Sequence, residues 1–71
     1  MVDTLLADRA HQALRKNPHL PQSRVRLLAQ QGRITLQGTV NSFYQKQMAQ
    51  ESLRDVEGVS EIENQLEVQW L

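Results

Sequence analysis

The sequence predicts an α+β domain, an α/β sandwich of the order αββαβ, in which a three-stranded mixed sheet carries two helices packed on one face. Three observations predict this fold. Two stretches repeat apolar residues at helical spacing, three others alternate apolar with polar residues, and 71 residues suit one small domain, residues 1–71. Because β-α-β crossovers are right-handed, the last strand should run parallel to the second.

The first helix is predicted from an apolar stripe at three- and four-residue spacings. The stripe comprises Val2, Leu5, Leu6, Ala10, Ala13 and Leu14. Asp3 or Thr4 can cap its start, because their side-chain oxygens accept from unpaired backbone N–H groups. The residue before Pro18 is driven out of the α region, so the helix should end there and residues 17–23 should form a loop.

A β-hairpin follows, because two short alternating stretches flank the turn sequence Gln30-Gln31-Gly32. In the first strand, inward residues alternate with outward ones: Val25, Leu27 and Ala29 against Arg24, Arg26 and Leu28. In the second, Ile34, Leu36 and Val40 point inward and Arg33, Thr35, Gln37 and Thr39 outward. Gly38 takes an inward position, where it should allow close approach of a helix backbone or a bulky residue, or mark a bulge. Met48 and Tyr44 are candidates to fill that space.

A second helix is predicted to begin at a capping box formed by Ser42 and Gln45 and to end at Gly58, a residue suited to a left-handed conformation. Its stripe comprises Tyr44, Met48, Ala49, Ser52, Leu53 and Val56. The last strand should point Ile62, Leu66, Val68 and Trp70 inward and Glu61, Glu63, Gln65, Glu67 and Gln69 outward. Asn64 interrupts the inward face, either as an amide bonded to backbone near the end of the second helix or as a ligand contact.

Charge and composition narrow the function classes. Eight basic and eight acidic residues cancel, which disfavours binding to nucleic acid. Because the sequence has no cysteine, it can form no disulfide and provides no thiol for chemistry. For the same reason, it gives no indication of the redox compartment. The sequence contains no signal or membrane-spanning pattern, so the chain is expected to be soluble, and it also fits a domain cut from a longer exported protein.

Candidate sites can each be interpreted in two ways. His11, His19, Glu61, Glu63 and Glu67 lack the spacing of a metal or acid–base site and fit a solvated surface, so no cofactor or metal is expected. Arg24, Arg26 and Arg33 form either an anion-binding patch on the open sheet face or cross-strand pairs with the glutamate row.

Apolar residues offer a second kind of contact. The first helix either packs on the sheet or lies on a membrane, although it lacks the cationic excess of an interfacial helix. Phe43 and Tyr44 are adjacent, so both cannot point into one core; Phe43 is the better candidate for an exposed anchor or a staple. Trp70 either covers the core or forms an apolar end with Leu71.

Two longer patterns run through these elements. The middle reads Gly32-x-Ile34-x-Leu36-x-Gly38-x-Val40-x-Ser42, and the end reads Val56-x-Gly58-Val59-x-x-Ile62-x-Asn64-x-Leu66-x-Val68. With Asp3, Leu6, Ala10, Leu14 and Pro18, they make the chain resemble the BON domain of bacterial osmotic-shock-protection and nodulation proteins.

This resemblance implies a non-enzymatic module that binds phospholipid membranes or cell-envelope components, in many cases in the periplasm. It carries no catalytic motif; its signature residues here, Gly32, Gly38, Gly58 and Asn64, are structural. The alternative is a protein–protein interaction or oligomerisation module of a larger protein, bound to a protein partner or neighbouring domain without lipid affinity. Oligomeric state and strand order are open.

Overall fold

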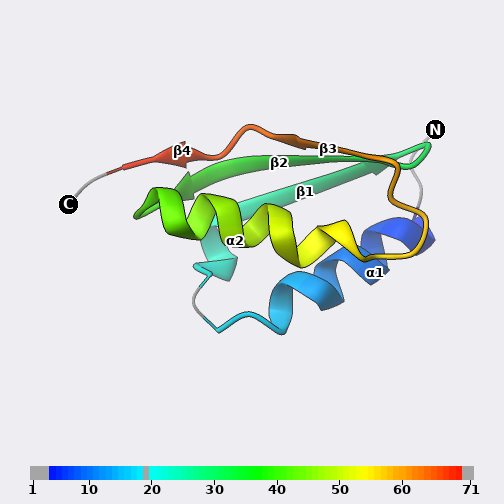
Figure 1. The fold of residues 1–71 in the computed structure, drawn as a ribbon, viewed down its shortest axis with the longest axis horizontal. Helices are drawn as coiled ribbons and strands as arrows, with labels where there is room; N and C mark the ends of the chain where they lie inside the picture. The colour runs from blue at the N-terminus through cyan, green and yellow to red at the C-terminus, as the bar shows by residue number, and fades with distance from the viewer. Residues whose placement is uncertain (1–3, 19, 70–71) are drawn as a thin grey trace.

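The fold is a mixed β-sheet with two helices on one face (Figure 1), as the sequence predicts. The computed structural model describes residues 4–18 and 20–69. In chain order the elements are α1 (Thr4–Arg15), the 3₁₀ turn η1 (Gln22–Arg24), β1 (Val25–Gln30), β2 (Arg33–Val40), α2 (Phe43–Arg54), β3 (Glu61–Asn64) and β4 (Glu67–Val68).

Strand β2 occupies the centre of the sheet, antiparallel to β1 and parallel to both β3 and β4. The β1–β2 turn is two residues long, with φ of 49° at Gln31 and 83° at Gly32. Positive φ at both central residues is the signature of a type I′ hairpin, whose twist matches that of the flanking strands. The predicted turn at Gln30-Gln31-Gly32 and the predicted parallel last strand are therefore confirmed.

The core lies between the sheet and the helices. Its buried apolar residues are Leu6, Ala10, Leu14, Leu20, Leu27, Ala29, Ile34, Leu36, Val40, Ala49, Leu53 and Leu66. Leu5 was expected in this stripe but is 61% exposed. Adjacent helical residues are separated by about 100° around the axis, so α1 cannot bury both Leu5 and Leu6 against one sheet.

Helix α2 begins as predicted. Ser42 is the N-cap, and its Oγ accepts from the Gln45 N–H at 3.1 Å. The Gln45 side chain reaches one residue further back than a capping box requires, because its Oε1 accepts from the Asn41 N–H at 2.7 Å. Tyr44, expected in the buried stripe, is 62% exposed, since it lies about 140° around the helix from the buried Ala49.

The end of α2 differs from the prediction. Its C-cap is Asp55, with φ of −97°, and Gly58 lies three residues further on. There Gly58 has φ of +99° and is the third residue of a tight turn closed by the Val59 N–H and the Val56 carbonyl at 3.2 Å. Gly58 therefore adopts the positive φ expected of it, but it does so in the connection to β3 rather than at the end of the helix.

Gly38 is explained by backbone, not by a helix or by Met48 or Tyr44. Its φ is +122°, and a Cβ there would overlap the carbonyl oxygen of Arg24 and lie 3.0 Å from that residue's carbonyl carbon. The β1–β2 pairing keeps one register from Gln30–Arg33 to Val25–Gly38, so Gly38 is the last residue of β2 that pairs with β1. The predicted last strand is interrupted beside this glycine: pairing stops after Leu36–Asn64 and resumes at Thr39–Glu67 in the same register, which separates β3 from β4.

Candidate interaction surfaces

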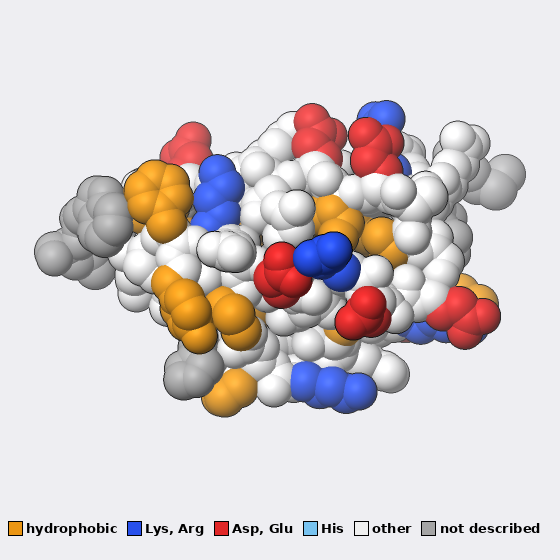
Figure 2. All heavy atoms as spheres, in the orientation of Figure 1, with side chains coloured by type: hydrophobic (Ala, Val, Ile, Leu, Met, Phe, Trp, Pro, Cys, Tyr) orange, Lys and Arg blue, Asp and Glu red, His pale blue; other side chains and the backbone are white. Residues whose placement is uncertain are grey.

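The most exposed large apolar side chains of the described chain stand together at the start of α2. Phe43 is 65% exposed and Tyr44 is 62% exposed. In Figure 2, hydrophobic side chains gather at the end of the molecule where α2 begins, whereas acidic and basic side chains mix over much of the remaining face. Phe43 is therefore exposed, as its interpretation as an anchor requires, and Tyr44 is exposed beside it.

Arg24 lies at the same end of the molecule. It belongs to η1 and not to the strand in which the sequence pattern placed it, because the chain turns there before β1 begins. Its Nη1 donates to Oδ1 of Asn41 at 3.4 Å, which brings the guanidinium to the residues that lead into Phe43. We call Arg24, Asn41, Phe43 and Tyr44 the aromatic end. Trp70, the third expected aromatic contact, lies outside the described residues.

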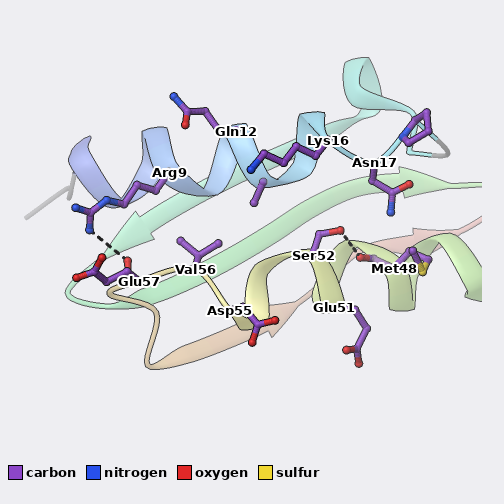
Figure 3. Close-up of a pocket in the computed structure, with 12 residues that line it drawn as sticks. Arg9, Gln12, Lys16, Asn17, Met48, Glu51, Ser52, Asp55, Val56 and Glu57 are labelled. Carbon is purple, nitrogen blue, oxygen red and sulfur yellow. Dashed lines mark hydrogen bonds between the residues drawn. The ribbon is translucent and has the colours of Figure 1, made fainter.

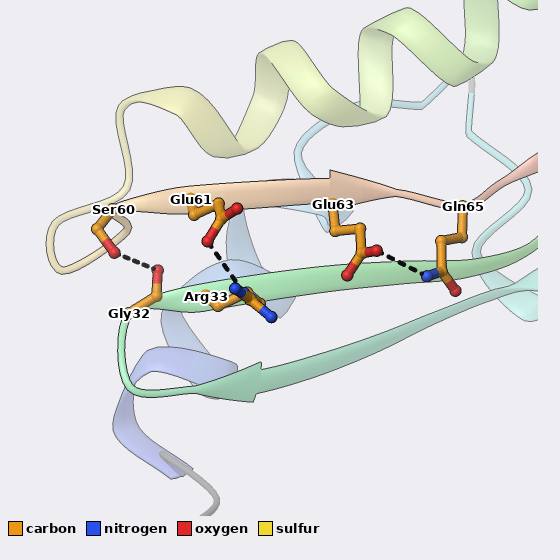
Figure 4. Close-up of polar contacts among 6 residues, drawn as sticks. All are labelled: Gly32, Arg33, Ser60, Glu61, Glu63 and Gln65. Carbon is orange, nitrogen blue, oxygen red and sulfur yellow. Dashed lines mark hydrogen bonds and ion pairs between the residues drawn. The ribbon is translucent and has the colours of Figure 1, made fainter.

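The other two arginines lie on the strands of the hairpin, Arg26 near the aromatic end and Arg33 at the opposite end. Arg33 starts β2, about 23 Å of extended strand from Val40 at the aromatic end. Its Nε contacts Oε2 of Glu61 at 3.0 Å, in the cross-strand pairing that was weighed against an anion patch (Figure 4). Arg26 is exposed on edge strand β1 opposite Gln37, so β2 separates it from the glutamate row. The three arginines therefore do not form one patch.

Asn64 ties β3 to α2. Its Nδ2 donates to the Lys46 carbonyl at 2.9 Å and to Oε1 of Gln50 at 3.3 Å, while its Oδ1 accepts from the Leu66 N–H at 3.2 Å. The predicted amide-to-backbone bond is present, but it goes to the first half of α2 rather than to the end of the helix. Those three hydrogen bonds explain, in structural terms, why an amide side chain occupies this position. They also supply a partner for a backbone N–H at the break between β3 and β4.

A groove of about 740 Å³ between α1 and α2 has no counterpart among the sequence-based expectations (Figure 3). Its walls carry opposite charges: Arg9 and Lys16 on the α1 side, and Glu51 and Asp55 on the α2 side. Arg9 closes one end, where its Nη1 donates to the Glu57 carbonyl at 3.4 Å. The spacing of Arg9, Gln12 and Lys16 could have indicated a polar face on this helix. The acidic wall opposite them, on α2, follows only from the packing of the two helices.

The candidate metal-binding residues that the structure describes are on the surface. His11, Glu61, Glu63 and Glu67 are exposed, and His19 lies outside the described residues. Across residues 4–18 and 20–69, no group of three or more His, Cys, Asp or Glu side chains is placed to hold a metal ion. No helix in this part of the chain has the length and apolar character needed to cross a membrane.

Two helices on one face of a sheet with β2 at its centre, together with the glycine and asparagine positions above, define a small α+β module. A family model of the BON domain matches residues 2–69, so the chain belongs to the BON domain family. A search of curated proteins returned no match to this chain.

Proposed function

We propose that this BON domain associates with phospholipid membranes or cell-envelope components through its aromatic end, and that it works without catalysing a reaction. The observation that carries the proposal is the pair of adjacent exposed rings at Phe43 and Tyr44, at the end of the molecule where the Arg24 guanidinium bonds to Asn41. An apolar group next to a cation suits the boundary between acyl chains and anionic headgroups. The N-terminal end of α2, where the helix dipole is positive, adds to this preference for anionic headgroups. Membership of the family supports an envelope location.

The expected contributions to the binding free energy indicate which part of the aromatic end contributes most to membrane association. An aromatic side chain buries about 150–250 Å², so inserting the exposed part of each ring would remove about 120 Å² from water. At about 25 cal/mol per Å², that contributes about 3 kcal/mol per ring. One basic residue near an anionic surface contributes about 1 kcal/mol. The rings should therefore determine whether the domain binds, and Arg24 should set its preference for anionic lipid.

The test is vesicle co-sedimentation with two compositions, phosphatidylcholine alone and phosphatidylcholine with phosphatidylglycerol. Wild-type protein should sediment with the mixed vesicles and more weakly with the neutral ones. Phe43→Gln should lower the partition coefficient by about a hundredfold, as expected from about 3 kcal/mol. The matched control is Leu5→Gln, which changes a leucine that is 61% exposed on α1, and it should bind like wild type.

A second pair of variants tests the electrostatic part. Arg24→Gln should weaken binding to anionic vesicles about fivefold and reduce its sensitivity to salt. Arg33→Gln removes the same charge at the opposite end of β2 and should change neither. Equal losses in Phe43→Gln and Leu5→Gln, or no sedimentation of wild type with either vesicle, would refute lipid binding through this end.

The alternative is a protein-interaction or oligomerisation module without lipid affinity. The α1–α2 groove favours this alternative, because its walls differ in charge and its floor includes Ala13, Met48 and Val56, a combination suited to a polypeptide more than to a lipid surface. A chain that fails to bind both vesicle types but scatters light above the monomer mass supports this second function. If the protein binds vesicles and remains a monomer at all concentrations, the hypothesis of an oligomerisation module is refuted.

A further inference from the structure

We infer that the groove between α1 and α2 binds an amphipathic helix of a partner protein, with acidic side chains along the flank that faces α1 and basic side chains along the flank that faces α2. The groove shares no residue with the aromatic end, and the inference holds whether or not the domain binds lipid. It rests on the charges of the two rims, on the floor between them and on the length of the groove.

The rims of the groove carry opposite charges that do not meet across it. Arg9 and Lys16 line the α1 side. Asp55 lines the α2 side together with Glu51, whose Oε2 lies 3.2 Å from Nη1 of Arg54 on the same helix. Among the described residues, no ion pair joins the two sides. In Figure 3 the Glu51 and Asp55 side chains point away from α1, so the groove lies open between its charged rims.

The floor between the rims is largely apolar and only partly covered. Met48, Ser52 and Val56 follow one another at four-residue intervals, and Ala13 of α1 completes the floor. The sequence predicts the first three as part of the buried stripe of α2, yet all four residues are half-buried. A partner helix laid in the groove would cover the part that α1 leaves exposed. The flexible Met48 side chain can adjust its shape to such a partner.

The spacing of the charges suits a helix. Arg9 and Lys16 are seven residues apart, which corresponds to two helical turns, or about 11 Å. Residues seven apart on a partner helix lie on one flank, so two acidic residues at that spacing would face both cations. Basic residues on the other flank would then face Asp55. Charges that flank an apolar stripe in this way determine partner choice where helices pack together.

The opposite charges of the rims favour a helix over other classes of ligand. An anionic lipid surface or a nucleic acid would meet the carboxylates of α2 as well as the cations of α1, and the carboxylates would repel it. A helix can present opposite charges on its two flanks and an apolar stripe between them, which is the arrangement used when a helix binds in a groove. The contact is small, so binding by the isolated domain is expected to be weak.

The probe is a synthetic peptide about four turns long, held helical by a hydrocarbon link on its outward face. Alanine and leucine form its apolar stripe, with glutamates along one flank and lysines along the other. A control peptide has the same composition, but glutamates and lysines are mixed on both flanks. In an NMR titration, the first peptide should shift the amide signals of Ala13, Lys16 and Ser52 to saturation, and the control should bind about tenfold more weakly.

Variants of the domain test the two rims separately. Lys16→Glu and Asp55→Lys should each weaken binding of the first peptide about tenfold, because each sets a like charge opposite one flank of the peptide. Arg15→Glu and Asp8→Lys are the matched controls. They make the same changes of charge at exposed positions of α1 that do not line the groove, and they should bind like wild type.

Phe43→Gln, which should weaken vesicle binding, should leave peptide binding unchanged, so this inference and the proposed function can fail separately. No saturable shift with the first peptide, equal affinity for the two peptides, or equal losses in Lys16→Glu and Arg15→Glu would each overturn the inference. Shifts of the groove signals that grow with protein concentration in the absence of peptide would assign the groove to a second copy and would overturn it as well.

Discussion

Replacing Gly38 by alanine tests the packing of β1 on β2 more sharply than a change in the apolar core would. Gly38 pairs with Val25, where the chain enters β1, and its φ is +122°. A Cβ at this position would overlap the Arg24 carbonyl oxygen and also lie 3.3 Å from the Val25 Cα. These neighbours are backbone atoms, so a side-chain rotation cannot relieve the overlap.

Two contributions set the size of the effect. Holding an L-residue at this φ adds strain of about 1–3 kcal/mol. Displacing the β1 backbone to make room adds about another 1–3 kcal/mol, as overpacking does in cores. Their sum, about 2–6 kcal/mol, is a large part of the total of about 4–11 kcal/mol expected for a chain of this length. Urea unfolding followed by circular dichroism should show a midpoint that falls steeply or a protein that is already unfolded.

Gly58→Ala is the matched control. Gly58 has a similar φ of +99°, but its Cβ would meet only Leu6 Cδ1 at 3.4 Å and Arg9 Nη1 at 4.0 Å, which is ordinary contact. The control should lose only the conformational contribution, about 1–3 kcal/mol. Equal destabilisation of the two variants would show that the overlap with Arg24 contributes nothing, and would refute the explanation given for Gly38.

Two further substitutions probe the polar contacts that fix α2. Ser42→Ala removes the N-cap acceptor of the Gln45 N–H and should destabilise the domain by about 0.5–2 kcal/mol in urea, whereas Ser42→Asp should restore most of that; no loss in the alanine variant would contradict the capping role. Asn64→Ala leaves the Lys46 carbonyl and the Leu66 N–H without their amide partner and should remove about 1–3 kcal/mol. The exposed Gln65→Ala, by comparison, should change stability little, and equal effects at positions 64 and 65 would count against the role of Asn64.

Periodicity predicts most of this fold because one face of each element is buried. In the last strand, Ile62, Leu66 and Val68 are buried or half-buried while the intervening glutamates are exposed, even though pairing is broken in the middle. Side-chain alternation depends on the extended backbone, not on continuous hydrogen bonding. The pattern therefore shows the direction of the side chains but not the break.

Sequence reasoning failed where neighbouring apolar residues compete for one face. Leu5 and Tyr44 fit a spacing rule, yet each lies on a helix whose buried face is already filled by other residues. The prediction for Gly38 was wrong for a different reason. The sequence indicated that this position requires a glycine, but the atoms that require it lie at the start of β1, and only the register of the hairpin brings them close to Gly38. The α1–α2 groove is likewise a product of tertiary packing, since its walls come from segments far apart in the chain.

The most direct test of the proposed function is an NMR titration with lipid nanodiscs that carry a spin label at the headgroup level. If the aromatic end meets the membrane, amide signals of Arg24, Asn41, Phe43 and Tyr44 should broaden first. Signals from Arg33, at the far end of β2, and from Glu61, its partner on β3, should remain sharp. If no amide signal broadens more than the others at any lipid concentration, or if broadening is centred on the α1–α2 groove, lipid contact through the aromatic end would be contradicted.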